Sequence, residues 1–100
     1  MNKYRNTPTV ADGITFSSKA EARRYGELKL LQRAGEITGF GIQPSFVLPS
    51  IGRYIPDFIV CGKDGNVWVE DVKGVETQVF KLKKRAWAAN YPWMELRVLK

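Results

Sequence analysis

The sequence contains no histidine and a single cysteine, Cys61. Without histidine, Ser-His-Asp and Cys-His catalysis are excluded, and so is a nuclease that uses histidine as its base. A lone cysteine can form no internal disulfide, and it also excludes a zinc finger or zinc knuckle. Hydrolytic chemistry in this chain must therefore depend on carboxylates, lysine and a metal ion.

Long apolar runs are also missing. No stretch approaches the ~20 residues that a membrane-spanning helix needs, and the first residues, 1–5, have no apolar signal-peptide core. We therefore expect a soluble, unexported protein without a membrane partner. The low cysteine content is typical of a reducing, cytoplasmic location.

The charge is unbalanced, with 16 Lys and Arg against 10 Asp and Glu, a net charge of +6. A basic surface suits a polyanionic partner, because Lys and Arg displace counterions from phosphates. The alternative is that the charge only keeps the protein in solution. The length of 100 residues predicts one domain. We expect residues 1–15 to form a flexible basic arm and residues 16–100 a single nuclease domain.

Hydrophobic periodicity and turn residues predict the elements of this domain. A capping pattern at Ser18 and Glu21 begins a helix that Gly35 ends. A second helix is predicted over 77–90. The expected strands span 36–48, 54–61, 67–73 and 93–99. The order α-β-β-β-α-β predicts an α/β fold, more closely an α+β mixed sheet of four strands flanked by helices.

The residues that indicate chemistry lie on the two strands of a predicted hairpin. A three-residue loop at 63–65 sets a register in which Asp57 lies across from Asp71, with Cβ atoms ~5 Å apart. Lys73 is two residues further on, on the same face. Facing carboxylates repel unless a cation lies between them, and carboxylate oxygens favour Mg²⁺ or Mn²⁺. The alternative is a solvated hairpin in which Lys73 pairs with one aspartate, although the strands flanking these residues are nearly continuously apolar.

Pro56-Asp57 and Asp71-Val72-Lys73 match the namesake pattern of the PD-(D/E)xK nuclease superfamily, which the chain resembles. Further motifs make it similar to short phage and prophage members: Phe16-x-Ser18-x-x-Glu21-Ala22-x-x-Tyr25, Gln43-Pro44-x-Phe46, Tyr54-x-x-Asp57-Phe58 and Glu70-Asp71-Val72-Lys73-Gly74. The resemblance covers residues 16–90. It implies a restriction-endonuclease-like core and a metal-dependent DNA endonuclease that hydrolyses phosphodiester bonds.

The resemblance also assigns roles to single residues. Asp57 and Asp71 would bind the metal, with the Val72 carbonyl as a backbone ligand. Lys73 would orient or help to deprotonate the attacking water and neutralise charge at the phosphate. Glu21 is a fourth candidate, because relatives often add an acidic ligand from the first helix. The alternative for Glu21 is that it only caps that helix.

Partners and location follow from the same resemblance. Small members of the superfamily are often homodimeric junction resolvases, so branched DNA, such as a Holliday junction, and a homodimer are expected. A phage-encoded protein of this kind would act in DNA recombination in the bacterial host cytoplasm. The alternatives are a DNA-binding module that keeps the fold without turnover, and a structural or host-interaction protein.

Other side chains have weaker assignments. Candidate DNA contacts, each of which has a solvated surface residue as its alternative, are Arg23, Arg24, Gln43, Lys81, Lys84 and Arg85. Glu70 points to the opposite face from Asp71 and is expected to be structural or to support the site. Trp87 and Trp93 are expected in the core.

Overall fold

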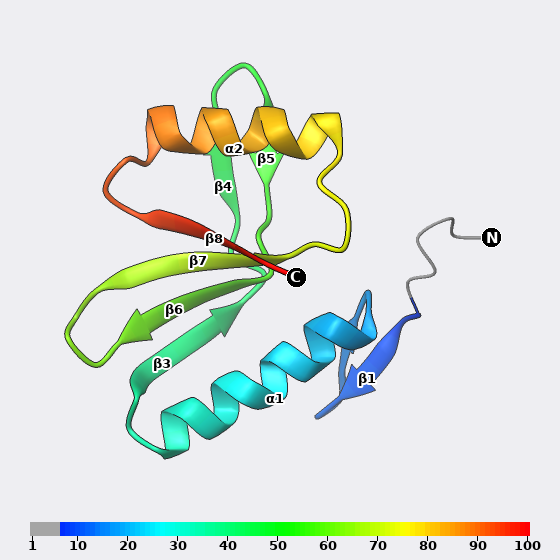
Figure 1. Cartoon of the computed structure of the whole chain (residues 1–100), viewed down its shortest axis with the longest axis vertical. Coiled ribbons are helices and arrows are strands. Elements are labelled where there is room, and N and C mark those ends of the chain that lie inside the picture. The colour runs from blue at the N-terminus through cyan, green and yellow to red at the C-terminus, as the bar shows by residue number, and fades with distance from the viewer. Residues whose placement is uncertain (1–6) are drawn as a thin grey trace.

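The computed structural model describes residues 7–100 and is built around a sheet of four strands in the order β3-β6-β7-β8 (Figure 1). The strands are β3 (Ile37–Ile42), β6 (Phe58–Gly62), β7 (Val67–Val72) and β8 (Glu95–Leu99). The β3–β6 and β6–β7 pairs are antiparallel, whereas β8 runs parallel to β7. The prediction of a four-stranded mixed sheet with two helices is confirmed.

The two helices, α1 (Lys19–Arg33) and α2 (Gln78–Asn90), begin at side-chain caps. Ser18 Oγ accepts a hydrogen bond from the Glu21 N–H at 3.1 Å, and Thr77 Oγ1 accepts one from the Phe80 N–H at 3.2 Å. Gly35 follows α1 with a φ of +79°, a conformation that glycine adopts without steric cost. Both predicted helices are therefore present within a residue or two of their expected ends.

Two small hairpins were not predicted. The first pairs β1 (Thr9–Ala11) with β2 (Ile14–Phe16), and the second pairs β4 (Phe46–Leu48) with β5 (Gly52–Tyr54). The flexible arm expected over 1–15 is thus wrong for residues 9–15, because the positive φ values of Asp12 and Gly13 form a tight turn between very short strands. Residues 1–6 lie outside the described part of the chain.

The strand expected over 36–48 is also wrong in its continuity. Gln43 has a φ of +51° and Pro44 follows it, so the chain leaves the central sheet after β3. It forms the β4–β5 hairpin and returns to the sheet at β6. Apart from the two hairpins, the elements follow the predicted order α-β-β-β-α-β.

The sheet separates two layers. α1 and the β1–β2 hairpin cover one face, and α2 and the β4–β5 hairpin cover the other (Figure 1). The core on the α1 side contains Phe16, Leu28, Ile37, Phe58, Val60 and Trp68. The core on the α2 side contains Leu48, Tyr54, Val69, Phe80 and Trp87. Neither of the two helices in residues 7–100 is long and apolar enough to cross a membrane.

Of the two tryptophans expected in the core, only Trp87 is buried. Trp93 is 72% exposed, because it follows Pro92 in the turn between α2 and β8 and no element covers it. The assignment of Trp93 to the core was therefore wrong.

Candidate functional site

The β6–β7 hairpin has the predicted register up to its open end. Phe58 pairs with Glu70 and Ile59 with Val69, and the loop glycine, Gly65, has a φ of +87°. The predicted pairing of Asp57 with Asp71 is wrong, because the regular ladder ends at Phe58 and the Asp57 N–H donates to the Glu70 carbonyl, at 3.0 Å. The side chain of Asp57 then accepts a hydrogen bond from the Val72 N–H at 2.6 Å. The structure therefore assigns a role to the amide of Val72, whereas its carbonyl as a metal ligand stays a prediction.

Asp57 and Glu21 form a carboxyl–carboxylate pair between β6 and the first turn of α1. Burial raises the pKa of Asp57, and the hydrogen bond to Glu21 and the negative charge of Asp71 raise it further, to about 9. Burial also raises the pKa of Glu21, but hydrogen bonds from Asp57 and Ser17 outweigh it, so this pKa is lowered. The hydrogen bond between the two carboxyl groups therefore favours the protonated form of Asp57.

The structure places Glu21 both at the cap of α1 and against Asp57, whereas its role as a metal ligand stays a prediction. Its carboxylate accepts hydrogen bonds from the Ser17 hydroxyl and from the backbone at Ser17 and Ser18, so it caps α1. The same carboxylate contacts Asp57. Capping brings Glu21 into the site instead of withdrawing it.

Asp71 lies near the end of β7 and is only 3% exposed. One of its oxygens accepts a hydrogen bond from the Tyr54 hydroxyl, and the other lies 3.3 Å from Lys73 Nζ. Burial, followed by the hydrogen bond to Asp71, raises the pKa of Tyr54 well above its usual range. Tyr54 therefore remains protonated and acts as a permanent donor to Asp71.

Tyr54 belongs to one of the sequence motifs, but the sequence predicts no role for it. The signal available was its place three residues before Asp57. Its contact with Asp71 depends on the β4–β5 hairpin, which places β5 beside the α2 face of the sheet. A hairpin of two three-residue strands leaves little periodicity in the sequence.

A hollow of about 310 Å³ opens beside Asp71. Its lining residues come from β5, the end of β7 and the beginning of α2: Arg53, Tyr54, Ile55, Asp71, Lys73, Thr77, Phe80 and Lys83. Lys73 Nζ lies 4.8 Å from the centre of the Phe80 ring. We call this space the basic hollow.

The acidic residues are of the right chemistry for a hard divalent cation, since Mg²⁺ and Mn²⁺ prefer carboxylate oxygens. Their side chains are nevertheless divided, with Asp57 on Glu21 and Asp71 on Tyr54. Within residues 7–100, no group of three acidic or cysteine side chains is gathered closely enough to hold a metal ion. A metal bound by both Asp57 and Glu21 would have to replace the hydrogen bond between them.

Comparison with protein families gives one match, which spans residues 1–100 and is described as "Protein of unknown function (DUF1064)". The chain belongs to the DUF1064 family. No curated protein and no solved structure matches it. Membership of the DUF1064 family assigns no activity to the chain.

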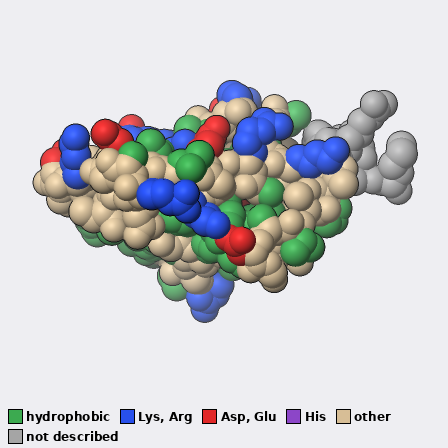
Figure 2. Space-filling view, turned by 90° about the horizontal axis from the view of Figure 1, so that it is seen from below, with side chains coloured by type: hydrophobic (Ala, Val, Ile, Leu, Met, Phe, Trp, Pro, Cys, Tyr) green, Lys and Arg blue, Asp and Glu red, His purple; other side chains and the backbone are tan. Residues whose placement is uncertain are grey.

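In this DUF1064 member, two of the basic DNA-contact candidates are occupied by carboxylates. Arg24 donates to both oxygens of Glu70, from Nε and Nη2, each at 2.8 Å. Lys84 Nζ lies 2.8 Å from Glu76 Oε1. Figure 2 shows basic side chains spread over the face seen from below, so no single basic patch marks a binding surface there.

The remaining DNA-contact candidates are exposed: Arg23, Gln43, Lys81 and Arg85. Of these, Gln43 lies next to the carboxylates, because its N–H donates to the Asp57 carbonyl at 2.9 Å. Its positive φ is uncommon for a residue other than glycine, and such backbone outliers cluster at functional sites. None of the remaining three lines the basic hollow.

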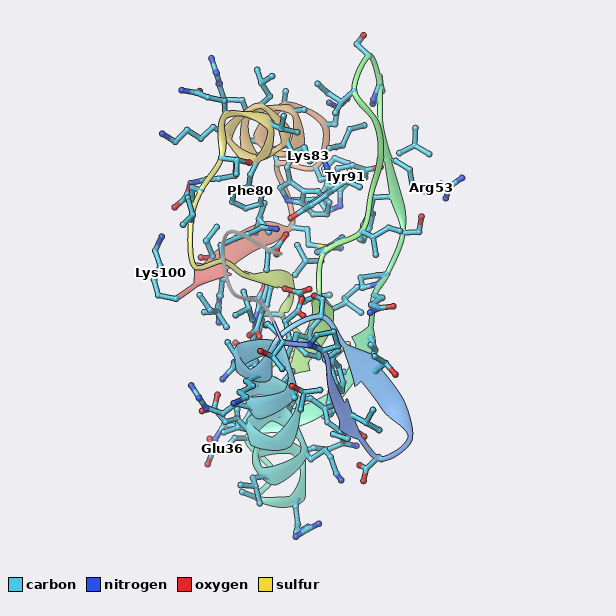
Figure 3. The ribbon with its side chains drawn as sticks, turned by 90° about the vertical axis from the view of Figure 1, so that its right-hand side faces the viewer. Glu36, Arg53, Phe80, Lys83, Tyr91 and Lys100 are labelled. Atoms are coloured by element: carbon cyan, nitrogen blue, oxygen red, sulfur yellow. The ribbon has the colours of Figure 1, made fainter. Side chains whose placement is uncertain are left out.

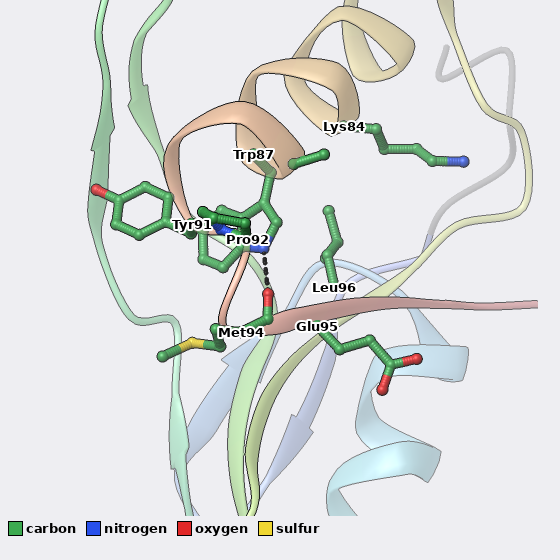
Figure 4. Close-up of a pocket in the computed structure, with 8 residues that line it drawn as sticks. Lys84, Trp87, Tyr91, Pro92, Met94, Glu95 and Leu96 are labelled. Carbon is green, nitrogen blue, oxygen red and sulfur yellow. Dashed lines mark hydrogen bonds between the residues drawn. The ribbon is translucent and has the colours of Figure 1, made fainter.

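A second hollow, of about 370 Å³, lies between the end of α2 and β8 (Figure 4). The Trp87 indole N–H donates to the Met94 carbonyl at 2.7 Å and fixes the connection between these elements. The two charged residues of its lining, Lys84 and Glu95, are paired with Glu76 and Arg97. This hollow has no titratable cluster and is not a candidate active site.

Proposed function

We propose that the protein is a metal-dependent DNA endonuclease that hydrolyses phosphodiester bonds, with Mg²⁺ or Mn²⁺ as its cofactor. One observation carries the proposal: Asp57, which is hydrogen-bonded to Glu21, lies within range of the charge of Asp71 at one end of β6 and β7, and Asp71 contacts Lys73. Burial raises the pKa of Asp57, and the hydrogen bond to Glu21 and the nearby negative charges add to this rise, so a bound cation would relieve an unfavourable charge there. The element order around the sheet supports the restriction-endonuclease-like topology.

The metal, when bound, would polarise a water molecule and neutralise charge on the phosphate. The chain supplies the orientation of its carboxylates. The Val72 N–H holds one oxygen of Asp57, and the Tyr54 hydroxyl holds one oxygen of Asp71. Lys73 Nζ, beside Asp71, can donate a hydrogen bond to the attacking water or to a phosphate oxygen.

The narrower proposals depend on the resemblance alone. They are a preference for branched DNA, such as Holliday junctions, a homodimer, and action in phage DNA recombination in the host cytoplasm. The test below includes branched DNA, and the oligomeric state can be measured by sedimentation.

A second candidate is a DNA-binding module without turnover. It is favoured by the division of the carboxylates between Tyr54 and Glu21, which leaves no ready-made group of three ligands within residues 7–100. Under this proposal, DNA binds but no metal accelerates its cleavage.

The test is a titration of Mg²⁺ and Mn²⁺ with plasmid, single-stranded and four-way-junction DNA. The variants are Asp71→Asn and Lys73→Ala, and Glu36→Gln is the matched control because Glu36 is exposed and paired with Lys63. We expect metal-dependent cleavage by the wild type and the control, and about 10²-fold or greater loss in both site variants.

Two results would contradict the proposal. Cleavage by Asp71→Asn at the wild-type rate would remove the assigned mechanism. Binding of DNA by the wild type with no cleavage at any metal concentration would favour the module without turnover.

A further inference from the structure

The basic hollow carries more positive than negative charge. Three of its lining residues, Arg53, Lys73 and Lys83, are cationic, and one, Asp71, is anionic. Asp71 is already contacted by Lys73 and by a tyrosine hydroxyl. Within residues 7–100, Lys83 and Arg53 form no ion pair.

Lys83 and Arg53, the two cations of the lining without an ion pair in the described part of the chain, lie on different sides of the β4–β5 hairpin. Figure 3 shows Lys83 on the side of α2 that faces the β4–β5 hairpin, and Arg53 on the far side of that hairpin. Lys83 Nζ lies 5.7 Å from the centre of the Tyr54 ring, whereas the guanidinium of Arg53 donates to Ser45 Oγ at 2.6 Å. Lys83 is therefore the cation directed into the hollow that has no protein carboxylate.

Aromatic rings hold both ammonium groups at the lining. Lys83 lies against Tyr54 and Lys73 against Phe80, and the negative face of an aromatic ring stabilises a cation as it loses water. Lys83 is only partly exposed and no carboxylate of residues 7–100 pairs with it, so its ammonium is available to an anion from outside. If the neighbouring carboxylates act on a bound nucleic-acid strand, the anions of that strand beside Lys83 would be its phosphates.

The beginning of α2 adds donors of the same kind. Thr77 lines the hollow, and its Oγ1 accepts a hydrogen bond from the Phe80 N–H, which leaves the hydroxyl proton free to donate. The N-terminal end of a helix also carries partial positive charge. Ile55, which also lines the hollow, is 52% exposed and offers apolar surface to a sugar or base.

We infer that the basic hollow binds a backbone phosphate of a nucleic-acid strand, next to the phosphate that is cleaved, with Lys83 and the Thr77 hydroxyl as donors. This inference deepens the proposed function and rests on it. It also assigns strand binding to Lys83, which the sequence left outside the candidate contacts, instead of to its neighbours Lys81 and Arg85.

The experiment measures binding without cleavage. Fluorescence anisotropy of a labelled single-stranded DNA oligonucleotide is recorded in EDTA over a series of salt concentrations. The variant is Lys83→Ala, and Lys81→Ala is its control, because Lys81 is an exposed lysine on the same helix that does not line the hollow. Lys83→Arg tests whether another cation restores binding, and circular dichroism checks that each variant is folded.

We expect Lys83→Ala to bind about tenfold more weakly than the wild type, the loss of one charged hydrogen bond. The slope of log K against log salt should fall by about 0.7, the value for one phosphate contact on a single strand. Lys81→Ala should change affinity less than twofold, and Lys83→Arg should bind nearly as well as the wild type. Inorganic phosphate should compete only weakly, because it offers no neighbouring sugar or base.

Equal affinities and slopes for Lys83→Ala and Lys81→Ala would overturn the inference, even if the wild type cleaves DNA. Absence of binding to the oligonucleotide would overturn it as well. Competition by poly-glutamate as strong as that by DNA would point to an acidic protein partner and reject a nucleic-acid strand. Binding that depends on Lys83, without metal-dependent cleavage, would support the binding of a nucleic-acid strand in the basic hollow and contradict the proposed nuclease activity.

Discussion

Glu70 and Asp71 are consecutive residues of β7, and both are buried, but their charges are compensated in different ways. Glu70 is fully buried on the α1 face and accepts two hydrogen bonds from Arg24 and one from the Trp68 indole, at 2.8, 2.8 and 2.9 Å. Every side-chain oxygen therefore has a partner within the fold. This arrangement confirms the expectation that Glu70 is structural.

Asp71 faces the α2 side and borders the basic hollow. Its partners are one hydroxyl, from Tyr54, and one ammonium, Lys73 Nζ, which itself is about a third exposed. A bidentate guanidinium neutralises its carboxylate completely, whereas these partners leave Asp71 open to a further cation or substrate group. Alternation along one strand thus places one carboxylate in an internal ion pair and the next one at the lining of a hollow.

The largest expected effect is on stability, from breaking the Glu70 pair. Arg24→Leu should lower the free energy of unfolding by about 3–5 kcal/mol, because it leaves a buried carboxylate without its cation. Lys73→Leu should cost about 1 kcal/mol or less, since Asp71 keeps its tyrosine donor and lies at an open hollow. Urea denaturation measures both, and equal costs would remove the distinction between the two carboxylates.

The next prediction concerns metal binding. Mg²⁺ or Mn²⁺ at about 100 times its dissociation constant should stabilise the wild type by about 2.7 kcal/mol, measured as a rise in Tm. Asp71→Asn should abolish most of this rise. Glu70→Gln should lower the starting Tm but keep the metal-dependent rise, because Glu70 lies on the other face of the sheet. A rise that is lost in both variants, or in neither, would contradict the assignment of roles.

A smaller effect is expected for the hydroxyl that orients Asp71. Tyr54→Phe removes one buried hydrogen bond to a carboxylate and should cost about 1–3 kcal/mol in unfolding free energy. If Asp71 is a metal ligand, the same variant should also weaken the metal-dependent rise in Tm without abolishing it. Calorimetry with and without metal measures both effects, and an unchanged metal response would show that Tyr54 has a structural role alone.

The smallest effect is expected at Asp12, an exposed carboxylate. The hydrogen bond from Lys29, with a further one from Tyr25, lowers the pKa of Asp12. A lowered pKa means that this contribution to stability is present at neutral pH and is lost as the pH falls below the ordinary value for aspartate. Asp12→Asn should therefore reduce stability slightly at pH 7 and not at low pH. A difference between the two proteins that grows on acidification would reverse the sign and contradict the pairing.

The local features of the site were predictable from the sequence. The register of the β6–β7 hairpin follows from a three-residue loop that ends in glycine, and the caps of both helices follow from Ser18 and Thr77. These depend on residues close together in the chain. The opposite faces of Glu70 and Asp71 follow from strand alternation in the same way.

The features that were missed depend on contacts between distant segments. Tyr54 reaches Asp71 only because the β4–β5 hairpin packs against α2 and the sheet, where the Tyr91 hydroxyl donates to the Val47 carbonyl at 2.8 Å. The ion pair between Arg24 and Glu70 joins residues that are 46 positions apart in the chain. The orientation of Lys83, unlike that of Lys81, is likewise fixed by the hairpin it faces.

The β4–β5 hairpin has an evolutionary consequence. Its strands pair only with each other and not with the central sheet, so no ladder of that sheet runs through it. Insertions or deletions at its tip, residues 49–51, would leave the carboxylates where they are. Because surface loops of this kind tolerate changes in length and sequence, relatives can diversify one wall of the basic hollow by loop exchange. Under the proposed function, selection could thus alter which nucleic-acid strand binds while Asp57 and Asp71 stay constant.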